Sequence, residues 1–365
     1  MKKRVGILTL QFANNYGGFL QTFALFTSLK KLGYSPLIIN RRYPLPNGIA
    51  SMYLNFVDTF INGSFNKFRQ RQFTSITEPI FSHESMKDVA KELDAVIVGS
   101  DQVWRLEYTK NIGFGYNMFL DFVPKEKKRI SYAASFGTDK FEGNNEDISV
   151  VKDLLSTFSG ISVRESSGVD LCSNLFNAHA EHVLDPTMLL KVEDYDTIII
   201  PAEVSNINDK HFVVQYLLDP NPKRKTISTK IAKKYNGNLK NIYRASDTDF
   251  SIKKHIFPSS KHTFPSFSNW LWSIKNAQFV VTDSFHGVVF CILFNKQFVC
   301  IANTSRGVAR MDSLLGMFGL RSRLIDELAN EEKYLNLPLI DYNEVNTLID
   351  FNREKSINFL INSLS

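Results

Sequence analysis

FVVTDSFHG, at residues 279–287, is the stretch of the chain that decides the fold class. Its first four residues are aromatic or β-branched, as in a strand that is buried on both faces of a sheet. A helical pattern follows at residues 287–294, and a second apolar run follows at 298–302. Strand, helix and strand in such close succession are typical of a βαβ unit, which builds a parallel sheet.

The same alternation continues outward in both directions along the chain. Further strands are predicted at residues 5–10, 35–40, 94–98, 129–134, 160–163, 212–218 and 239–243. Helices are predicted at residues 19–32, 147–158, 166–175, 226–235, 268–276 and 342–364, whereas residues 54–81 are aromatic-rich and hard to assign. We therefore expect an α/β fold with two doubly wound, Rossmann-like domains that face each other across a cleft.

The length of 365 residues is too great for one ordinary core, which supports two domains. No Gly/Ser-rich linker separates them, so we place the boundary between two predicted elements. The expected division is a first α/β domain at residues 1–190, a second at 191–325, and a helical tail at 326–365 that packs back on the first domain.

Composition and charge narrow the function classes. Hydrophobic residues make up 44% of the chain, but no uninterrupted apolar run reaches the roughly 18 residues of a membrane span. The basic residues 2–4 and the short apolar run at residues 5–10 are predicted to lead into and form the first strand, not a signal peptide. The net charge of +6 leaves three interpretations open: solvated surface charge, an anionic substrate or membrane face, and nucleic acid. Nucleic acid is the least favoured, because no nucleic-acid motif accompanies the charge.

The cysteine and histidine patterns do not predict a metal site. Cys172, Cys291 and Cys300 form no CxxC pair, which fits a reducing cytosol. His179 and His182 have a spacing that could bind a metal, but no carboxylate pattern supports it, so we assign no metal.

Candidate site residues follow the strand at residues 279–282. Asp283, Ser284, His286 and Gly287 stand where a strand ends and a helix starts, and a helix start offers N–H groups to an anion. The alternative for Asp283 and Ser284 is that they cap the helix and bind nothing. His286 is the preferred acid–base group, because an imidazole titrates near neutral pH.

Three arginines follow other strands and could bind an anion. Arg164 ends the strand at residues 160–163, and a guanidinium there can bind a phosphate or carboxylate with two hydrogen bonds. The alternative is an ion pair between Arg164 and Glu165 or another carboxylate. Arg306 and Arg310 come after the strand at 298–302, and we prefer Arg306 as the ligand because it lies outside the expected helix.

Two loops of the first domain are weaker candidates for ligand binding. Asn15, Tyr16 and Gly17 follow the first strand, and glycine lets backbone approach a ligand closely. Ser100 and Asp101 end the strand at residues 94–98 in the same way. Asp101, Asp283 and Glu165 are each a candidate base for an acceptor hydroxyl, and the sequence does not choose among them.

Several of these motifs, taken together and in order, resemble the polysaccharide pyruvyl transferase family. The matching pieces span about residues 5–325 and are NYGG (15–18), VGSDQVW (98–104), ISYAASFG (130–137), ISVRE (161–165), VLDPT (183–187), TDSFHG (282–287), Arg306-Gly307 and Arg310. Each piece is weak evidence alone, but the ordered set is specific. Residues 54–81 and the tail beyond 325 match nothing diagnostic.

The resemblance implies a fold like that of B-type glycosyltransferases and phosphoenolpyruvate as the donor substrate, with no further cofactor. It implies that Arg164, His286 and a later basic residue, which corresponds approximately to Arg306, surround the donor, and we expect the second domain to be the donor side. The acceptor is then expected on the side of the first domain. The implied reaction forms a pyruvate ketal on a sugar of a surface or capsular polysaccharide precursor.

Two other functions remain open at this stage. One is a B-type glycosyltransferase that uses a nucleotide sugar, and the other is a non-catalytic subunit that binds a glycan or an anion. For all three we expect a cytoplasmic protein whose partner is a glycan, which a lipid could carry. The basic charge leaves open a peripheral contact with the inner membrane face.

Overall fold

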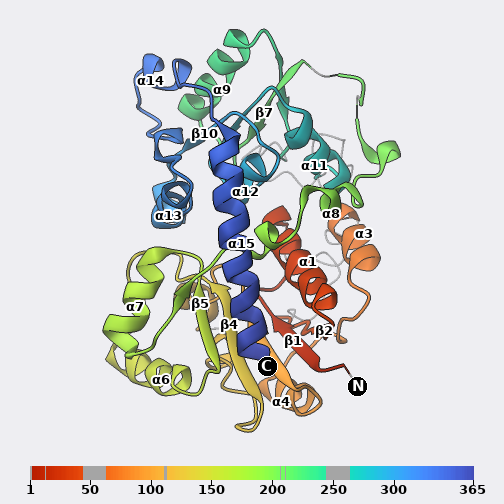
Figure 1. The fold of residues 1–365 in the computed structure, drawn as a ribbon, viewed down its shortest axis with the longest axis vertical. Coiled ribbons are helices and arrows are strands. Elements are labelled where there is room, and N and C mark those ends of the chain that lie inside the picture. The colour runs from red at the N-terminus through yellow and green to blue at the C-terminus, as the bar shows by residue number, and fades with distance from the viewer. Residues whose placement is uncertain are drawn as a thin grey trace, which may run out of the picture.

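The fold of the chain is two parallel sheets flanked by helices, one above the other along the long axis of the molecule (Figure 1). The computed structural model describes residues 2–12, 14–43, 63–110, 113–205, 207–209, 211–243 and 264–365. Of the aromatic-rich segment 54–81, residues 54–62 therefore lie outside the described part, and residues 63–72 form a helix.

The first domain contains a six-stranded sheet in the order β2-β1-β3-β4-β5-β6. Every neighbouring pair in it is parallel. Its strands are β1 (Arg4–Leu8), β2 (Ser35–Ile38), β3 (Ala95–Val98), β4 (Lys128–Ala134), β5 (Gly160–Val163) and β6 (Glu181–His182).

The second domain contains a five-stranded parallel sheet in the order β11-β10-β9-β7-β8. Its strands are β7 (Phe212–Tyr216), β8 (Asn238–Asn241), β9 (Phe279–Thr282), β10 (Phe298–Ile301) and β11 (Leu324–Ile325). The two sheets thus share one winding, in which the first strand lies between the second and the third. Ligands of such sheets bind at this switch point, outside the carboxyl ends of the strands.

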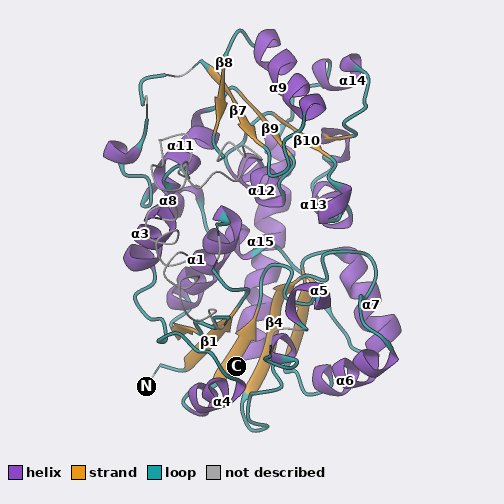
Figure 2. Cartoon of the chain, turned by 180° about the vertical axis from the view of Figure 1, so that it is seen from behind, coloured by secondary structure: helices purple, strands orange, loops and turns teal. Residues whose placement is uncertain are grey.

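Helices cover both sheets on either side (Figure 2). In the first domain they are α1 (Tyr16–Lys31), α3 (Gly63–Gln72), α4 (His83–Lys91), α5 (Leu106–Thr109), α6 (Asn145–Leu155) and α7 (Ser166–Phe176). The others are α8 (Val192–Asp196), α9 (Pro222–Lys234), α11 (Phe267–Asn276), α12 (Phe285–Leu293), α13 (Ala309–Met317), α14 (Glu331–Leu335) and α15 (Tyr342–Leu364).

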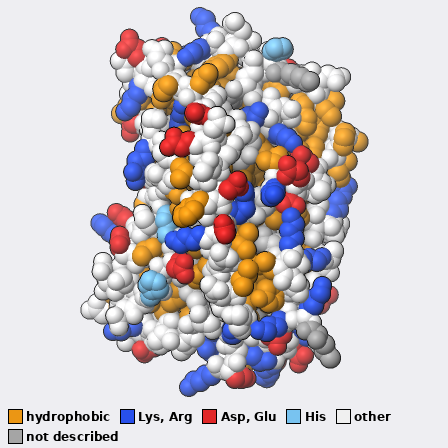
Figure 3. Space-filling view, in the orientation of Figure 1, with side chains coloured by type: hydrophobic (Ala, Val, Ile, Leu, Met, Phe, Trp, Pro, Cys, Tyr) orange, Lys and Arg blue, Asp and Glu red, His pale blue; other side chains and the backbone are white. Residues whose placement is uncertain are grey.

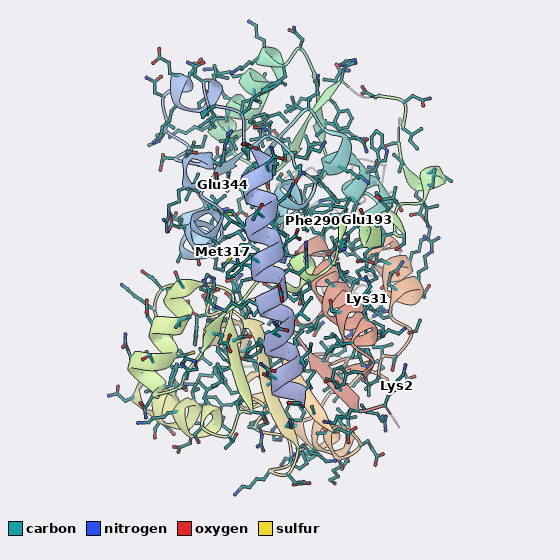
Figure 4. The ribbon with its side chains drawn as sticks, in the orientation of Figure 1. Lys2, Lys31, Glu193, Phe290, Met317 and Glu344 are labelled. Carbon is teal, nitrogen blue, oxygen red and sulfur yellow. The ribbon has the colours of Figure 1, made fainter. Side chains whose placement is uncertain are left out.

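Helix α15 joins the two domains. It begins against the second domain, where the Tyr342 hydroxyl donates to the carbonyl of Lys296, and it ends on β4 of the first. In Figure 4, Met317 of α13 and Phe290 of α12 lie on either side of α15 below Glu344. One hydrophobic core extends from Val5 and Ile7 of β1 to Val280 of β9, and it includes the buried face of α15.

Several helices begin earlier than their sequence patterns predict, among them α9, which starts at Pro222, and the two helices beside the site. Helix α1 starts at Tyr16, so Gly17 lies in its first turn and does not break the chain before it. Helix α12 starts at Phe285, because the Ser284 side chain caps it by accepting from the N–H of Gly287. Sequence periodicity places the body of a helix well, whereas its first turn depends on the cap.

Candidate functional site

A cavity opens between the carboxyl ends of the two sheets. Its volume is about 600 Å³, including open solvent at its mouth. The first domain contributes Asn15, Asp101 and Gln102 to its wall. The second contributes Leu218, Asp283, Ser284, Phe285, His286, residues 301–303, Arg306, Gly307, Val308, Arg310 and Met311. The cavity therefore lies where two doubly wound sheets are expected to bind a ligand.

His286 in the first turn of α12 faces a buried carboxylate of the first domain. Its Nε2 atom is 3.6 Å from Oδ2 of Asp185, beyond hydrogen-bond distance but close enough for an ion pair when the ring is protonated. The side chain is buried, and Nε2 has no hydrogen-bond acceptor or donor in the described structure. The Nδ1 side of the ring lies against Gly17 of α1, where a Cβ atom would overlap it.

Asp185, which follows β6, contacts several polar side chains of the site at once. Its Oδ2 accepts from Nη1 of Arg164 at 2.9 Å and from Oγ of Ser100 at 3.3 Å, and its Oδ1 accepts from Oγ1 of Thr187 at 2.7 Å. Burial alone would raise the pKa of the Asp185 carboxyl, but His286, Arg164 and Thr187 hold it well below its ordinary value. Asp185 therefore stays ionised beside the imidazole.

Arg164 lies behind the cavity wall. Its guanidinium packs 4.2 Å from the centre of the Phe285 ring, pairs with Asp185 and lies 3.6 Å from Oδ1 of Asp101. Burial would lower the pKa of Arg164, but Asp185 and Asp101 raise it above its ordinary value. Arg164 does not line the cavity, and its Nε and Nη2 atoms are buried without a hydrogen-bond acceptor in the described structure.

Arg310 is a buried cation that lines the cavity without a carboxylate hydrogen-bonded to it. Its Nη2 donates to the carbonyl of Arg306, whereas Nε has no acceptor in the described structure. Burial lowers the pKa of Arg310 to about 10, and the nearby Arg164 contributes to the shift. A buried donor without an acceptor is costly, so this position favours an anionic ligand.

Arg306 lies at the cavity mouth and is exposed. Its guanidinium binds Asp219 through two hydrogen bonds, Nε to Oδ2 at 2.6 Å and Nη2 to Oδ1 at 2.9 Å. The hydrogen bond from Arg306 lowers the pKa of Asp219, although partial burial opposes the shift. An anion that binds Arg306 must therefore compete with Asp219.

Of the three candidate bases, Asp283 and Glu165 already have partners. Asp283 accepts from the N–H of Leu218 at 2.6 Å and from Nη1 of Arg224 at 2.8 Å, and burial raises its pKa. Glu165 is fully buried, its Oε1 accepts from the N–H of Phe136, and burial raises its pKa. These contacts favour a positioning role for Asp283 and a structural one for Glu165.

Asp101 is the candidate base that faces the cavity from the first domain. It accepts one short-range hydrogen bond, from the N–H of Gln102 at 2.9 Å, and it lines the cavity beside Asn15. Its φ of 76° lies in the left-handed region, where Asp is one of the few tolerated residues other than glycine. Such conformations occur disproportionately at functional sites.

Three residues predicted to bind substrate lie inside the protein instead. Tyr16 stacks on Trp270, and its hydroxyl donates to the carbonyl of Pro265 at 2.6 Å. Ser100 has no exposed surface, and its Oγ donates to the carbonyl of Ala133. Gly287 is buried, and its N–H donates to the capping Ser284. Each of these groups already has a partner within the chain.

Sequence reasoning did not single out Asp185, Phe285 or Asp219 as site residues. Asp185 stands in the quoted VLDPT motif, but its partners come from three distant segments, so no local pattern shows its role. Asp219 follows β7 as Asp101 follows β3, and that shared position at a strand end was the available signal.

The described part of the chain contains no group of three His, Cys, Asp or Glu side chains that could hold a metal ion. Within the same residues, no helix has the length and apolar character needed to cross a membrane. On the face shown in Figure 3, basic and acidic side chains are interspersed and form no single basic patch.

Comparison with known families identifies the chain. A sequence model of polysaccharide pyruvyl transferases matches residues 15–305, which is most of the chain. The chain belongs to the polysaccharide pyruvyl transferase family. The matched region of this transferase family includes Asp101, Asp185 and His286, and it ends just before Arg306.

Solved structures show the same fold at low sequence identity. S. aureus MnaA, solved with UDP, has a TM-score of 0.51 and 12% identity, and the match covers 99% of this chain and 96% of that chain. Medicago truncatula UGT71G1 with UDP-glucose has a TM-score of 0.50 and 10% identity over 100% and 98%. UDP-GlcNAc 2-epimerase from Methanocaldococcus jannaschii has a TM-score of 0.50 and 12% identity over 95% and 92%.

These likenesses confirm the predicted α/β fold of two Rossmann-like domains, which resembles that of B-type glycosyltransferases. At this level of sequence identity, these structural likenesses are evidence for the fold only. Curated protein sequences gave no significant match.

Proposed function

We propose that this member of the family transfers the enolpyruvyl carbons of phosphoenolpyruvate to a sugar of a polysaccharide precursor and forms a pyruvate ketal. One observation supports this proposal above the others. A buried histidine, paired with an ionised carboxylate, lies in the wall of the same cavity as an arginine whose Nε has no acceptor. That combination suits a small anion that must also receive a proton.

The donor carries a carboxylate and a phosphate, and both need cationic partners. Arg310 would supply a buried N–H donor, and Arg306 would bind at the mouth once it exchanges Asp219 for the ligand. Arg164 acts one step further away, because it holds Asp185 in place and ionised. Asp283 would act in the same indirect way by fixing Arg224 and the start of the loop after β7.

His286 would deliver the proton that starts the reaction. Asp185 lies beside Nε2 and can pair with the protonated ring, which would supply the proton to the methylene carbon. Protonation converts the methylene to a methyl group and leaves an oxocarbenium-like carbon. A sugar hydroxyl then adds to that carbon, and the bond to the phosphate oxygen breaks. A neighbouring hydroxyl closes the ketal, and its proton leaves with the phosphate.

Transfer activity tests the proposal directly. The purified protein is incubated with phosphoenolpyruvate and glycan precursors from the producing cell, and both phosphate release and the mass of one ketal-linked pyruvate on the glycan are measured. We expect transfer with phosphoenolpyruvate and none with UDP-glucose. The replacement His286→Ala should lower turnover about a hundredfold or more. His211→Ala, which removes an exposed histidine, is the matched control. Transfer from UDP-glucose alone would replace the proposal with the nucleotide-sugar alternative.

Asp101 is our candidate for the base that takes the proton of the attacking hydroxyl. Asp101→Asn keeps the side-chain size, and Asn tolerates the positive φ, so the fold should remain intact. We expect turnover to fall about a hundredfold or more, and the melting temperature to fall less than in Asp283→Asn, because Asp101 is 3.6 Å from Arg164 whereas Asp283 is 2.8 Å from Arg224. Asp283→Asn should instead lower the melting temperature, because it weakens the buried pair with Arg224. A reversal of these two results would exchange the roles of Asp101 and Asp283.

We also propose that a lipid carries the acceptor at the inner membrane face. The net charge of +6 supports contact with anionic lipid. Flotation with anionic and with neutral liposomes tests it, and equal recovery from both would contradict it.

A further inference from the structure

Arg41 is a buried cation that the proposed reaction does not use. It follows β2 at the carboxyl edge of the first sheet and is 2% exposed. Its Nη2 donates to the hydroxyl of Tyr43 at 3.3 Å, whereas Nε and Nη1 are buried without an acceptor. The rings of Tyr43 and Phe114 lie 5.0 and 5.4 Å from the guanidinium carbon.

Other buried arginines in the described part of the chain differ from Arg41 in one respect. Each of them donates to a carboxylate or a backbone carbonyl: Arg129 to Leu120 and Val123, Arg164 to Asp185, Arg224 to Asp283, Arg310 to Arg306, and Arg323 to Pro338. Arg41 has only a tyrosine hydroxyl and two aromatic faces. Burial lowers the pKa of Arg41, and Tyr43 offsets that shift in part.

A buried guanidinium without an anion is unfavourable, because its desolvation is not repaid by a counter-ion. Cation–π contacts with two rings recover part of that free energy, but they leave the N–H groups unbonded. The missing partner is an oxyanion, since a guanidinium binds phosphate and carboxylate oxygens best.

The position of Arg41 suggests which molecule brings the oxyanion. In the first sheet β1 separates β2 from β3, so the ends of β2 and β3 are roughly 10 Å apart, which is two strand spacings. Asp101 follows β3 and faces the cavity. The backbone N–H of Tyr43 donates to the side chain of Gln11, in the loop that leads to Asn15 in the cavity wall.

We propose that Arg41 binds an anionic group of the acceptor glycan, a phosphate or a carboxylate, about one to two sugar units from the hydroxyl that is modified. This rests on the proposed function, because it places the acceptor along the edge of the first sheet. Tyr43 covers the guanidinium and is itself only half-buried, so a change of its rotamer would uncover Arg41.

Anion binding without catalysis tests the site separately from the reaction. Calorimetric titrations use the whole protein with inorganic phosphate in one arm and glucuronate in the other, in the absence of phosphoenolpyruvate and glycan. We expect Arg41→Met to abolish one binding event that the unmodified protein shows, while any event in the cavity at Arg310 remains. Arg323→Met removes a buried arginine that already donates to a carbonyl, and it should keep every event.

If Arg41→Met loses a binding event in the titration with inorganic phosphate, the ligand group is a phosphate. If it loses one in the titration with glucuronate, the ligand group is a carboxylate. Equal binding by the unmodified protein and Arg41→Met in both arms would overturn the proposal, and so would the loss of the same event in Arg323→Met. If Arg41→Met does not fold, Arg41→Lys replaces it, with at least a tenfold weaker anion affinity expected.

A kinetic measurement connects the site to the acceptor. Arg41→Lys should raise the KM for an anionic glycan at least tenfold and leave the KM for phosphoenolpyruvate unchanged. A purely structural role would change both or neither. If pyruvyl transfer is absent but phosphate binding depends on Arg41, the proposed function fails and the anion site stands. If transfer proceeds and Arg41 does not affect anion binding, only this inference fails.

Discussion

At the scale of single residues, Asp185 connects the candidate acid with the rest of the protein. It receives donors from the first sheet, through Ser100, and from the loop after β5, through Arg164, and it faces His286 from the second domain. One carboxylate therefore joins groups of the first domain and lies 3.6 Å from the ring of His286 in the second. A catalytic imidazole needs such an orienting partner, because the proton must sit on a defined nitrogen.

We predict that Asp185→Asn lowers the free energy of unfolding at neutral pH. It should also make that free energy less sensitive to a fall in pH. Removing one partner of a buried ion pair costs about 3–5 kcal/mol of unfolding free energy at neutral pH. The folded-state pKa of Asp185 lies below the ordinary 3.8, so its contribution is fully present above about that pH and is lost as the pH falls further. The variant should therefore lose less stability than the unmodified protein when the pH drops below about 4.

Denaturant unfolding at neutral pH and at several acidic pH values measures both effects of this replacement. Asp312→Asn is the control, because Asp312 pairs with Arg321 on the surface at 3.0 Å and should contribute only about 0–1 kcal/mol. Parallel acid curves for Asp185→Asn and the unmodified protein would contradict the assigned pKa shift.

At the scale of elements, the start of α1 meets the start of α12. Gly17, in the first turn of α1, touches the ring of His286, and a Cβ there would overlap Nδ1. Gly18, its neighbour in the same turn, would place a Cβ at an ordinary 3.5 Å from the side chain of Asn15. The two glycines are in a helix and differ mainly in what they face, so they form a matched pair.

We predict that Gly17→Ala and Gly18→Ala have opposite effects. Gly18→Ala should be neutral or stabilise the protein by up to about 1 kcal/mol, because alanine favours a helix over glycine. Gly17→Ala should cost about 1–3 kcal/mol through overpacking and should lower turnover by displacing His286. Denaturant unfolding and the transfer assay measure the two quantities. Equal stability and equal turnover in both variants would show that the contact with His286 is unimportant.

Sequence patterns predicted the elements better than they predicted the site. The buried strands are short apolar runs whose character does not depend on distant partners, and so β9 and its neighbours were placed correctly. The first turn of α1 was missed because glycine at position 17 suggests the end of a regular element. In the structure, Gly17 is in the helix, and a side chain there would overlap the ring of His286 in the other domain. Asp185 and Phe285 were missed as site residues for the same reason, since their roles arise only when the domains meet.

At the scale of the whole molecule, two sheets of equal winding meet at their carboxyl ends and share one core. Two of the close contacts between the domains are Gly17 with His286 and Gly137 with Gly307. A Cβ on Gly307 would overlap the carbonyl oxygen of Gly137, which comes from the loop after β4. A side chain at either place would therefore disturb the contact between the domains beside the cavity.

A side chain at Gly307 would press on the backbone of Gly137 in the other domain and would also lie 4.0 Å from Nε of Arg310. Gly307 and Gly319 both have positive φ, at 84° and 68°, so an alanine at either site strains the backbone, and more so at Gly307, whose ψ of 113° lies outside the left-handed helical region. A Cβ on Gly319 would meet nothing within 4 Å, whereas one on Gly307 would push the domains apart. We expect Gly307→Ala to increase the radius of gyration measured by X-ray scattering and to reduce turnover about a hundredfold, because reacting groups on the two domains no longer align. Gly319→Ala should change neither quantity. If Gly307→Ala keeps full turnover at an unchanged radius, catalysis does not require this spacing between the domains.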